Sequence, residues 1–327
     1  MRVLLTGANG FIGSHILDRL VESGSEVAIL LRRTGDTRFI EARLPRVDIR
    51  YGSLDSTESL REAFRDAEVI IHCAGKTKAV RKKDYYAVNA EGARRVVEAC
   101  NALSDSVAQL ILISSLAVSG PGSVESPARE DAPPRPVSTY GKSKMLGEQY
   151  VRRQSRVPYT ILRPSAVYGP RDRDFYLAFR MARRKLLPLI GGGRQALSLI
   201  YAADVAEGVL RSIGNSASHG NTYHLAHAVP WTQRALLAKM AEAMGTRPLR
   251  FGVPAAVLYP ACLLRDLWSR VTGRPSILTL EKVPEYRAPG WVCATDRAAE
   301  DLGFVAGTSL DEGIKLTLKW YTEQRWL

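Results

Sequence analysis

Residues 1–20 read MRVLLTGANGFIGSHILDRL, and this stretch decides the fold class. The apolar run at residues 2–7 predicts a short buried strand, and residues 12–23 place apolar side chains at helical spacing. Between them lies GxxGxxG, whose glycines permit a tight turn and let the backbone approach a pyrophosphate at the helix N-terminus. The opening therefore predicts a dinucleotide-binding unit with cofactor contacts from Gly7, Asn9, Gly10, Phe11, Ile12 and Gly13.

The first 169 residues repeat this alternation of strand and helix. Further apolar strands are expected at residues 26–32, 47–53, 68–75, 108–118 and 159–169, and an amphipathic helix at 89–103. Such a pattern is typical of a parallel sheet covered on both faces. We therefore expect a doubly wound α/β domain over residues 1–169, to which residues 197–226 return. Residues 170–196 and 227–327 are expected to form a smaller, mostly helical substrate-binding region.

The composition, with 46% hydrophobic and 24% charged residues in 327, is that of an ordinary globular protein. Four widely spaced cysteines without a CxxC pair argue against a disulfide scaffold or a zinc site, and they favour a reducing compartment. The longest apolar stretch, residues 251–264, is too short to cross a bilayer. We expect no metal, no transmembrane segment and a cytoplasmic location.

The net charge of +13 has several interpretations. The arginines are scattered and no nucleic-acid-binding module is recognisable, so nucleic acid is not expected as a partner. A solvated basic surface, an anionic cofactor or substrate, and attraction to acidic lipid headgroups all remain open.

The end of the second expected strand bears on the choice of cofactor. An acidic residue there would bind the ribose hydroxyls of NAD, but this chain has Arg32 and Arg33 and no carboxylate until Asp36. Guanidinium groups suit a 2′-phosphate because they bind phosphate through two hydrogen bonds. We expect NADP(H), with NAD(H) as the alternative.

A second stretch, STYGKSKMLGEQY at residues 138–150, contains Tyr140 and Lys144 on one helical face. Hydride transfer to a carbonyl also needs a proton for the nascent alkoxide, and a lysine ammonium lowers the pKa of a nearby phenol. Ser114 and Ser115 follow an expected parallel strand, at the end where ligands bind in open α/β sheets. These residues predict a proton-transfer site beside the nicotinamide.

In their order and spacing, TGANGFIG, SSLAVSG, YGKSK and RPSAVYGP resemble the extended short-chain dehydrogenase/reductase family, also called the NAD(P)-dependent epimerase/dehydratase family. The C-terminal sequence is similar to the 3β-hydroxysteroid dehydrogenase and dihydroflavonol-reductase-like branch. The resemblance implies a Rossmann fold with Ser115, Tyr140 and Lys144 as catalytic residues, Lys144 also binding the nicotinamide ribose. The further cofactor contacts implied are Ser53, Leu54, Ala74, Gly75, Pro164, Ala166 and Val167, and a homodimer through helices 89–103 and 140–153 is expected.

The chain also departs from the family pattern. Ser119 replaces a tyrosine that many members have, so a contact typical of sugar-modifying enzymes is in doubt. Leu116 and Ala117 replace the acidic pair of the dehydratases, and this excludes dehydration of a nucleotide sugar. Asn89, Asp55 and Asp204 are each open to interpretation as helix N-caps.

Three functions remain. The first is oxidation or reduction of a hydrophobic secondary alcohol or ketone with NADP(H). The second is epimerisation of a nucleotide sugar, with Arg171, Arg180 or Arg194 contacting a diphosphate. The third is a catalytically silent NAD(P)-binding regulator. A run of apolar residues would form the core of the small region, line a lipophilic pocket or lie on a membrane surface: Val257, Leu258, Leu263, Leu264, Leu267 and Trp268.

Overall fold

The fold is built on a seven-stranded sheet with order β11-β6-β5-β4-β1-β2-β3, in which every neighbouring pair is parallel. The structure is a computed structural model, which describes residues 1–273, 276 and 279–327, without the side chains of residues 255, 256 and 258. The strands are β1 (Arg2–Thr6), β2 (Glu26–Leu31), β3 (Asp48–Tyr51), β4 (Val69–His72), β5 (Gln109–Ile113), β6 (Tyr159–Pro164), β7 (Ala166–Tyr168), β8 (Leu186–Ile190), β9 (Ala196–Leu197), β10 (Leu199–Tyr201), β11 (Asn221–Leu225), β12 (Trp231–Thr232), β13 (Leu249–Val253) and β14 (Gly290–Trp291). The expected Rossmann-like α/β architecture is confirmed.

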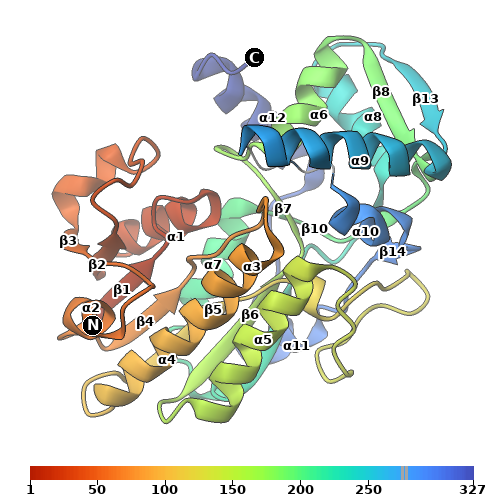
Figure 1. The fold of residues 1–327 in the computed structure, drawn as a ribbon. Helices are drawn as coiled ribbons and strands as arrows, with labels where there is room; N and C mark the ends of the chain where they lie inside the picture. The colour runs from red at the N-terminus through yellow and green to blue at the C-terminus, as the bar shows by residue number, and fades with distance from the viewer. Residues whose placement is uncertain (274–275, 277–278) are drawn as a thin grey trace.

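Helices cover both faces of this sheet (Figure 1). They are α1 (Phe11–Glu22), α2 (Thr57–Phe64), α3 (Lys82–Tyr86), α4 (Gly92–Ala102), α5 (Thr139–Gln154), α6 (Asp174–Arg183), α7 (Ala202–Ser212), α8 (Gln233–Ala243), α9 (Ala255–Thr272), α10 (Val283–Arg287), α11 (Asp296–Leu302) and α12 (Leu310–Glu323). Short turns used below are η2 (Ala87–Glu91), which is π-helical, and the 3-10 turns η3 (Leu116–Val118) and η6 (Leu280–Lys282).

Alternate residues of each strand supply the two halves of the core. Val3 and Leu5 of β1 are buried with side chains of α1, α7 and α11. Leu4, which lies between them, is buried on the other face with side chains of α2, α4 and α5. Strands buried on both faces must be apolar at nearly every position, which explains the continuous runs in the sequence.

The stretch expected as one strand at residues 159–169 is two strands, and the expectation of a single strand is wrong. The chain changes its partner at Ser165, whose N–H donates to Leu225 O at 2.9 Å, whereas the N–H of Ala166 donates to Ser198 O at 3.3 Å. The first part is β6 in the main sheet, and the second is β7, which pairs with β10 in a separate two-stranded sheet.

The remaining C-terminal elements form a second body at one end of the sheet (Figure 1). Its core contains buried side chains of α6, β8, α8 and α12, among them Phe179, Leu187 and Tyr321. The helix α9 differs, because Leu264 and Trp268 are 68% and 61% exposed. For Val257, Leu263, Leu264, Leu267 and Trp268 the core interpretation is therefore wrong, and Leu258 lies outside the described side chains.

The three N-cap interpretations are also wrong. Ser56 rather than Asp55 caps α2, through a hydrogen bond from the N–H of Ser59. Asp204 lies inside the first turn of α7 and accepts hydrogen bonds from Thr308. Asn89 lies inside the π-helical turn η2.

A buried ion pair joins α5 to the sheet. Arg163 of β6 donates to both carboxylate oxygens of Glu148, at 2.8 and 2.6 Å, and the two side chains are 1% and 3% exposed. Ser114, at the end of β5, donates to the same carboxylate at 2.5 Å, and Arg163 also donates to Ser119 at 3.0 Å. Each charge therefore has several partners, as burial requires.

We predict that Arg163→Met lowers the free energy of unfolding by about 3–5 kcal/mol, because the Glu148 carboxylate then stays buried without its partner. The double variant Arg163→Met/Glu148→Leu should lose less than the sum of the single variants. Urea denaturation measures both effects. As a control, Arg65→Met removes the exposed pair with Glu62 and should cost no more than about 1 kcal/mol. A loss below about 1 kcal/mol in Arg163→Met would contradict the prediction.

Candidate active site

The glycine-rich loop brings β1 and α1 into contact with the end of β4. Gly7 has φ +75°, and a Cβ there would lie 2.6 Å from the backbone nitrogen of Ala74. A Cβ at Gly13 would collide with the carbonyl of Gly7. Gly10 precedes α1 and has no side chain to cap it, so the first N–H groups of the helix stay available to an anion. These features fit the pyrophosphate of a dinucleotide.

The residues expected around the rest of the cofactor lie near this loop. Asn9 donates from Nδ2 to the carbonyl of Asp36 at 2.9 Å, which ties the loop after β2 to the glycine-rich turn. Arg32 and Arg33 are exposed, and the guanidinium of Arg33 lies 4.8 Å from the centroid of the Tyr51 ring. Among the described residues neither arginine forms an ion pair with a carboxylate.

The other expected cofactor residues occupy neighbouring strand ends and loops. Ser53 donates to Asp55 at 2.9 Å, and a Cβ at Gly92 of α4 would meet the Leu54 side chain. The N–H of Ala74 donates to Thr6 Oγ1 at 3.2 Å. The segment with Pro164, Ala166 and Val167 runs from β6 into β7, and the ring of Phe11 packs edge-on against His15 with centroids 5.7 Å apart.

Tyr140 lies in the first turn of α5, which begins after Ser138, and its hydroxyl lies near that of Ser115. Burial raises the pKa of Tyr140 to about 12, whereas the nearby Ser115 hydroxyl acts to lower this pKa and the Glu285 carboxylate raises it further. Ser115 follows the C-terminal end of β5 and caps η3. The structure thus brings Ser115 and Tyr140 together at the C-terminal ends of the strands, where ligands bind in such sheets.

Lys144 is buried one helical turn after Tyr140. Its ammonium donates to the carbonyl of Ile113, the last residue of β5, at 2.6 Å. Burial lowers the pKa of Lys144 to about 8. Gly75 is near, since a Cβ there would lie 3.8 Å from Lys144 Nζ. The cation therefore lies between the end of β4 and the end of β5.

Asn89 connects the loop after β4 to α5. Its Oδ1 accepts from the N–H of Lys76 at 2.7 Å, and its Nδ2 donates to Lys76 O at 3.0 Å and to Ser143 Oγ at 2.9 Å. Both the oxygen and the nitrogen of the Asn89 amide therefore have hydrogen-bond partners. Asn89 thus fixes the position of the Tyr140 helix relative to the cofactor loop.

Sequence reasoning missed three residues around Tyr140. The Tyr85 ring centroid lies 6.3 Å from that of Tyr140, and Lys282 Nζ of η6 lies 5.8 Å from the Tyr140 ring centroid. Glu285 of α10 has a buried carboxylate oxygen, Oε1, without a hydrogen-bond partner. No sequence signal relates residues 282 and 285 to residue 140, because only the tertiary fold brings these segments together.

Ser119, the replacement for the family's tyrosine, points into the protein. Its hydroxyl is hydrogen-bonded to His224 Nε2 at 2.7 Å and accepts from Arg163. Burial and the Arg163 charge lower the pKa of His224 to about 3, so the ring is neutral at physiological pH. Ser119 is thus part of the buried polar network around Arg163.

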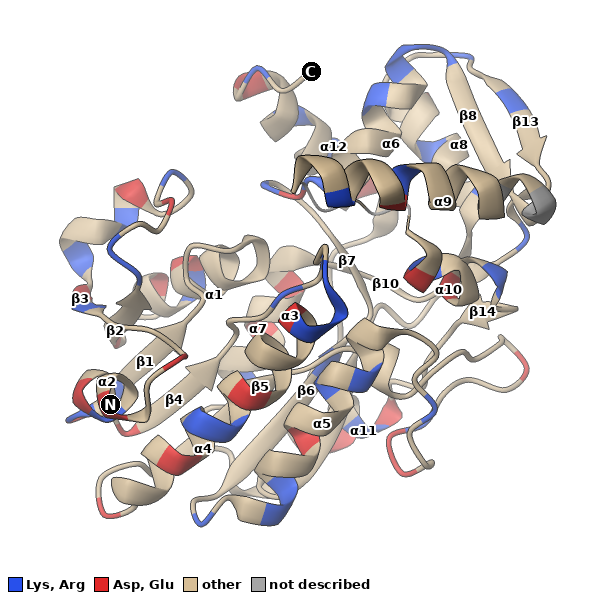
Figure 2. Ribbon diagram, in the orientation of Figure 1, with Lys and Arg blue, Asp and Glu red and all other residues tan. Residues whose placement is uncertain are grey.

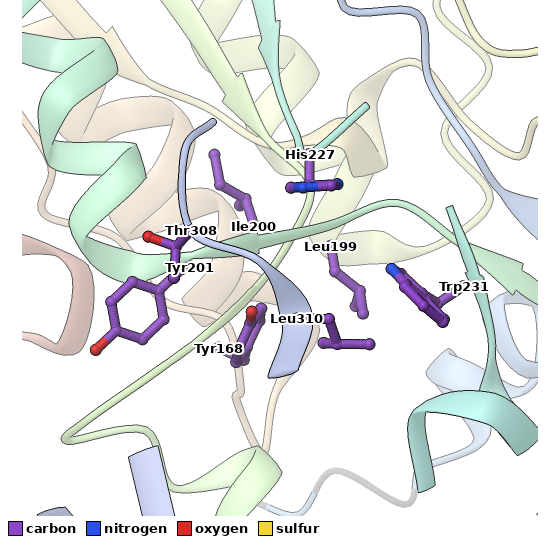
Figure 3. Close-up of a pocket in the computed structure, with 8 residues that line it drawn as sticks. All are labelled: Tyr168, Leu199, Ile200, Tyr201, His227, Trp231, Thr308 and Leu310. Carbon is purple, nitrogen blue, oxygen red and sulfur yellow. The ribbon is translucent and has the colours of Figure 1, made fainter. Parts of the chain in front are cut away.

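A small cavity lies between β10 and the start of α12, and Tyr140 is not among the residues that line it. It has a volume of about 10 Å³ and is lined by Tyr168, Leu199, Ile200, Tyr201, His227, Trp231, Thr308 and Leu310, as Figure 3 shows. This is space for about one water molecule, so it is a packing defect rather than a substrate site.

Comparison with known proteins agrees with this geometry. The model of the NAD dependent epimerase/dehydratase family matches residues 3–226. The chain belongs to this family. This family member is 30% identical over 336 residues to a ceramide reductase of Caulobacter vibrioides (strain NA1000 / CB15N), covering 99% of this chain and 96% of that protein. It is 24% identical to a decarboxylating sterol-4-alpha-carboxylate 3-dehydrogenase of Dictyostelium discoideum, covering 95% and 98%.

Solved structures of the family have the same fold. The UDP-glucose 4-epimerase of Thermus thermophilus, in complex with NAD, superposes with a TM-score of 0.76 at 26% identity, covering 98% of this chain and 99% of that one. Homologues are thus both oxidoreductases and epimerases, which identifies the chain as an NAD(P)-dependent enzyme.

We predict that Lys144 loses its proton near pH 8, well below the value of about 10.4 of an exposed lysine, because its burial penalises the charged form. Correlation of side-chain ¹³Cε and ¹⁵Nζ resonances over a pH series measures this. The resonance that titrates near pH 8 should vanish in Lys144→Met and persist in Lys142→Met, which removes an exposed lysine of the same helix. Titration of every lysine resonance above pH 10 would refute it.

Proposed function

We propose that this protein is an NADP(H)-dependent oxidoreductase that transfers a hydride between the nicotinamide and a secondary alcohol or ketone. The observation that carries the proposal is the proximity of the Ser115 and Tyr140 hydroxyls beside the buried Lys144 at the end of β5. The proton donor Tyr140, the orienting hydroxyl of Ser115 and the cation Lys144 thus lie together at the C-terminal ends of the strands, where the cofactor is expected.

Each of the three residues has a role in reduction. Ser115 and Tyr140 donate hydrogen bonds to the carbonyl oxygen of the substrate, and Tyr140 then transfers its proton to that oxygen. With a pKa of about 12, Tyr140 is protonated at neutral pH, which suits a proton donor. The Lys144 ammonium stabilises the phenolate that remains and donates to the nicotinamide ribose.

The chain offers a consistent site for the cofactor. The glycine-rich loop and the start of α1 bind the pyrophosphate, Ser53 and Leu54 lie at the adenine end, and Pro164 to Val167 at the nicotinamide end. Arg32 and Arg33 bind the 2′-phosphate, because both are exposed at the end of β2 and no carboxylate occupies the position that would bind the NAD ribose. When bound, the nicotinamide supplies or accepts the hydride.

Two relatives support a lipophilic substrate. One is named a ceramide reductase and the other a sterol-4-alpha-carboxylate 3-dehydrogenase, and both names describe oxidation or reduction of a lipid. We therefore propose a hydrophobic ketone or alcohol as the substrate. We also propose a cytoplasmic homodimer through α4 and α5, which static light scattering tests.

Epimerisation of a nucleotide sugar is the second candidate, favoured by the similarity to the Thermus thermophilus UDP-glucose 4-epimerase. Of the three arginines expected near a diphosphate, Arg171 pairs with Asp18 at 2.8 Å, whereas Arg180 and Arg194 are exposed. Conversion of a UDP-sugar to its epimer, without net change in added cofactor, would favour this candidate. A regulator without turnover is the third.

We predict that Tyr140→Phe lowers kcat of reduction by about 10²–10⁴-fold, because it removes the proton donor but little volume. Cofactor affinity, measured by quenching of intrinsic fluorescence, should stay within about 3-fold of the unaltered protein. Steady-state loss of NADPH absorbance measures the rate. Tyr85→Phe, which alters the neighbouring ring, is the matched control and should retain most activity. Unchanged turnover in Tyr140→Phe would refute the assigned role.

We predict that Arg32→Ala weakens NADPH binding by about 10-fold or more while NADH affinity changes little, because only NADPH carries the 2′-phosphate. Isothermal titration with each nucleotide measures both constants. Arg61→Ala, an exposed arginine of α2, controls for a general effect of charge. Unchanged NADPH affinity in Arg32→Ala would show that the arginine faces solvent only.

A further inference from the structure

The helix α9 is oriented with its apolar face outwards. Among the described side chains of α9, the buried ones are Cys262 and Ser269, which are 0% and 3% exposed. The described large apolar side chains of α9 face solvent at helical spacing: Val257, Tyr259, Leu263, Leu264, Leu267, Trp268 and Val271, all at least 46% exposed. A surface helix of a globular protein usually has the opposite orientation.

The strand pair beside α9 extends the apolar surface. β8 and β13 are parallel, with Leu186 opposite Leu249 and Pro188 opposite Phe251, so these four side chains share one face. Leu249, Leu186 and Phe251 are 66%, 46% and 42% exposed. The opposite face, with Leu187 and Leu189, is buried in the core of the second body. The chain passes from the end of β13 directly into α9.

Positive charge surrounds these side chains. Exposed basic residues lie on α9 itself, directly before β8 and at the adjoining ends of α6 and α8, as Figure 2 shows for these elements: Arg180, Arg183, Arg184, Lys185, Arg247, Arg265 and Arg270. Among the described residues of α9, Asp266 is the only acidic one, and it is paired with Arg270 at 3.1 Å. The region is therefore both apolar and strongly basic.

The combination of exposed apolar side chains with basic residues indicates what kind of partner this surface binds. A large exposed apolar patch marks an interaction surface. Tryptophan, tyrosine and leucine flanked by arginine are typical of a helix that lies in the interface of a bilayer, with its apolar face among the acyl chains and its cations at the headgroups. A second copy of this chain would bring like charges together, which disfavours association.

We propose that the outer face of α9, together with the outer face of the β8–β13 pair, docks on an anionic phospholipid surface. The contact is peripheral, since no helix in the described part of the chain is long and apolar enough to span a membrane. Apolar burial supplies depth and the arginines supply attraction to anionic headgroups. The proposal depends only on this surface and is independent of the proposed reaction.

The docked face adjoins the candidate active site. α9 packs against η6 and α10, and Lys282 of η6 lies over the Tyr140 ring. Docking would therefore bring η6 and α10, next to the Tyr140 site, close to the lipid headgroups. A substrate that resides in the membrane would need only a short path to reach it.

The test is binding of the full-length protein to vesicles without substrate or cofactor. Vesicles of phosphatidylcholine alone are compared with vesicles of phosphatidylcholine and phosphatidylglycerol, by cosedimentation at low and high salt. Of the five tryptophans, all of them in described positions, Trp268 alone is exposed, so its emission reports burial in lipid. We expect binding to the anionic vesicles, a shift of emission to shorter wavelength and release by salt.

Two variants and their controls test the residues. Leu264→Ser/Leu267→Ser should lower vesicle partitioning about 10-fold or more, whereas Val229→Ser/Val305→Ser, which alters exposed valines elsewhere, should not. Arg270→Gln should lower it about 5-fold. Arg65→Gln is the control, because Arg65, which directly follows α2, is also paired with a nearby acidic residue and is 65% exposed against 67% for Arg270.

Three results would overturn the proposal. The first is failure of the unaltered protein to bind anionic vesicles. The second is binding of the α9 variants as tight as that of the unaltered protein. The third is a dimer in light scattering that dissociates in Leu264→Ser/Leu267→Ser, because a second copy would then cover this face.

Discussion

The buried ion pair between Arg163 and Glu148 fixes the helix on which the candidate active site depends. Glu148 lies one turn after Lys144 on α5, and its carboxylate also accepts from Ser114, next to Ser115. Lys144 adds a second attachment through the carbonyl of Ile113. Because α5 is tied in this way to the ends of β5 and β6, Tyr140 and Ser115 meet without a flexible element between them. A rigid arrangement of this kind is what proton transfer beside a hydride donor requires.

The parts of the fold that depend on local pattern were predictable from the sequence. The parallel sheet and the glycine-rich turn follow from apolar runs and glycine spacing, and the sequence predicts Ser115 after a strand and Tyr140 on a helical face with Lys144. The rest depends on contacts between distant segments. The change of partner at Ser165, the bridge made by Asn89 and the approach of Lys282 to Tyr140 have no local signal. Ser119 was recognised as a departure from the family, but its burial against His224 required the fold.

The difference between local pattern and tertiary contact also explains why the sequence leaves the surroundings of the apolar side chains of α9 open. Hydropathy alone does not tell whether a leucine faces a core or the solvent, and both arrangements give the same helical periodicity. The fold resolves the question, because Cys262 and Ser269 of α9 are buried whereas Leu264 and Trp268 are exposed. The molecule thus combines a rigid catalytic edge with a basic, apolar outer face, and η6 and α10 connect the two.

Transfer of deuterium from NADPH labelled at C4 of the nicotinamide tests the assigned chemistry most directly. The purified protein would be incubated with each labelled stereoisomer and with lipophilic ketones or UDP-sugars, and the products analysed by mass spectrometry. A hydride-transferring site built from Ser115, Tyr140 and Lys144 predicts one deuterium on the carbinol carbon of an alcohol, from one stereoisomer only. Formation of a UDP-sugar epimer with the label retained in the cofactor would contradict net reduction, and absence of any transfer would contradict the catalytic assignment itself.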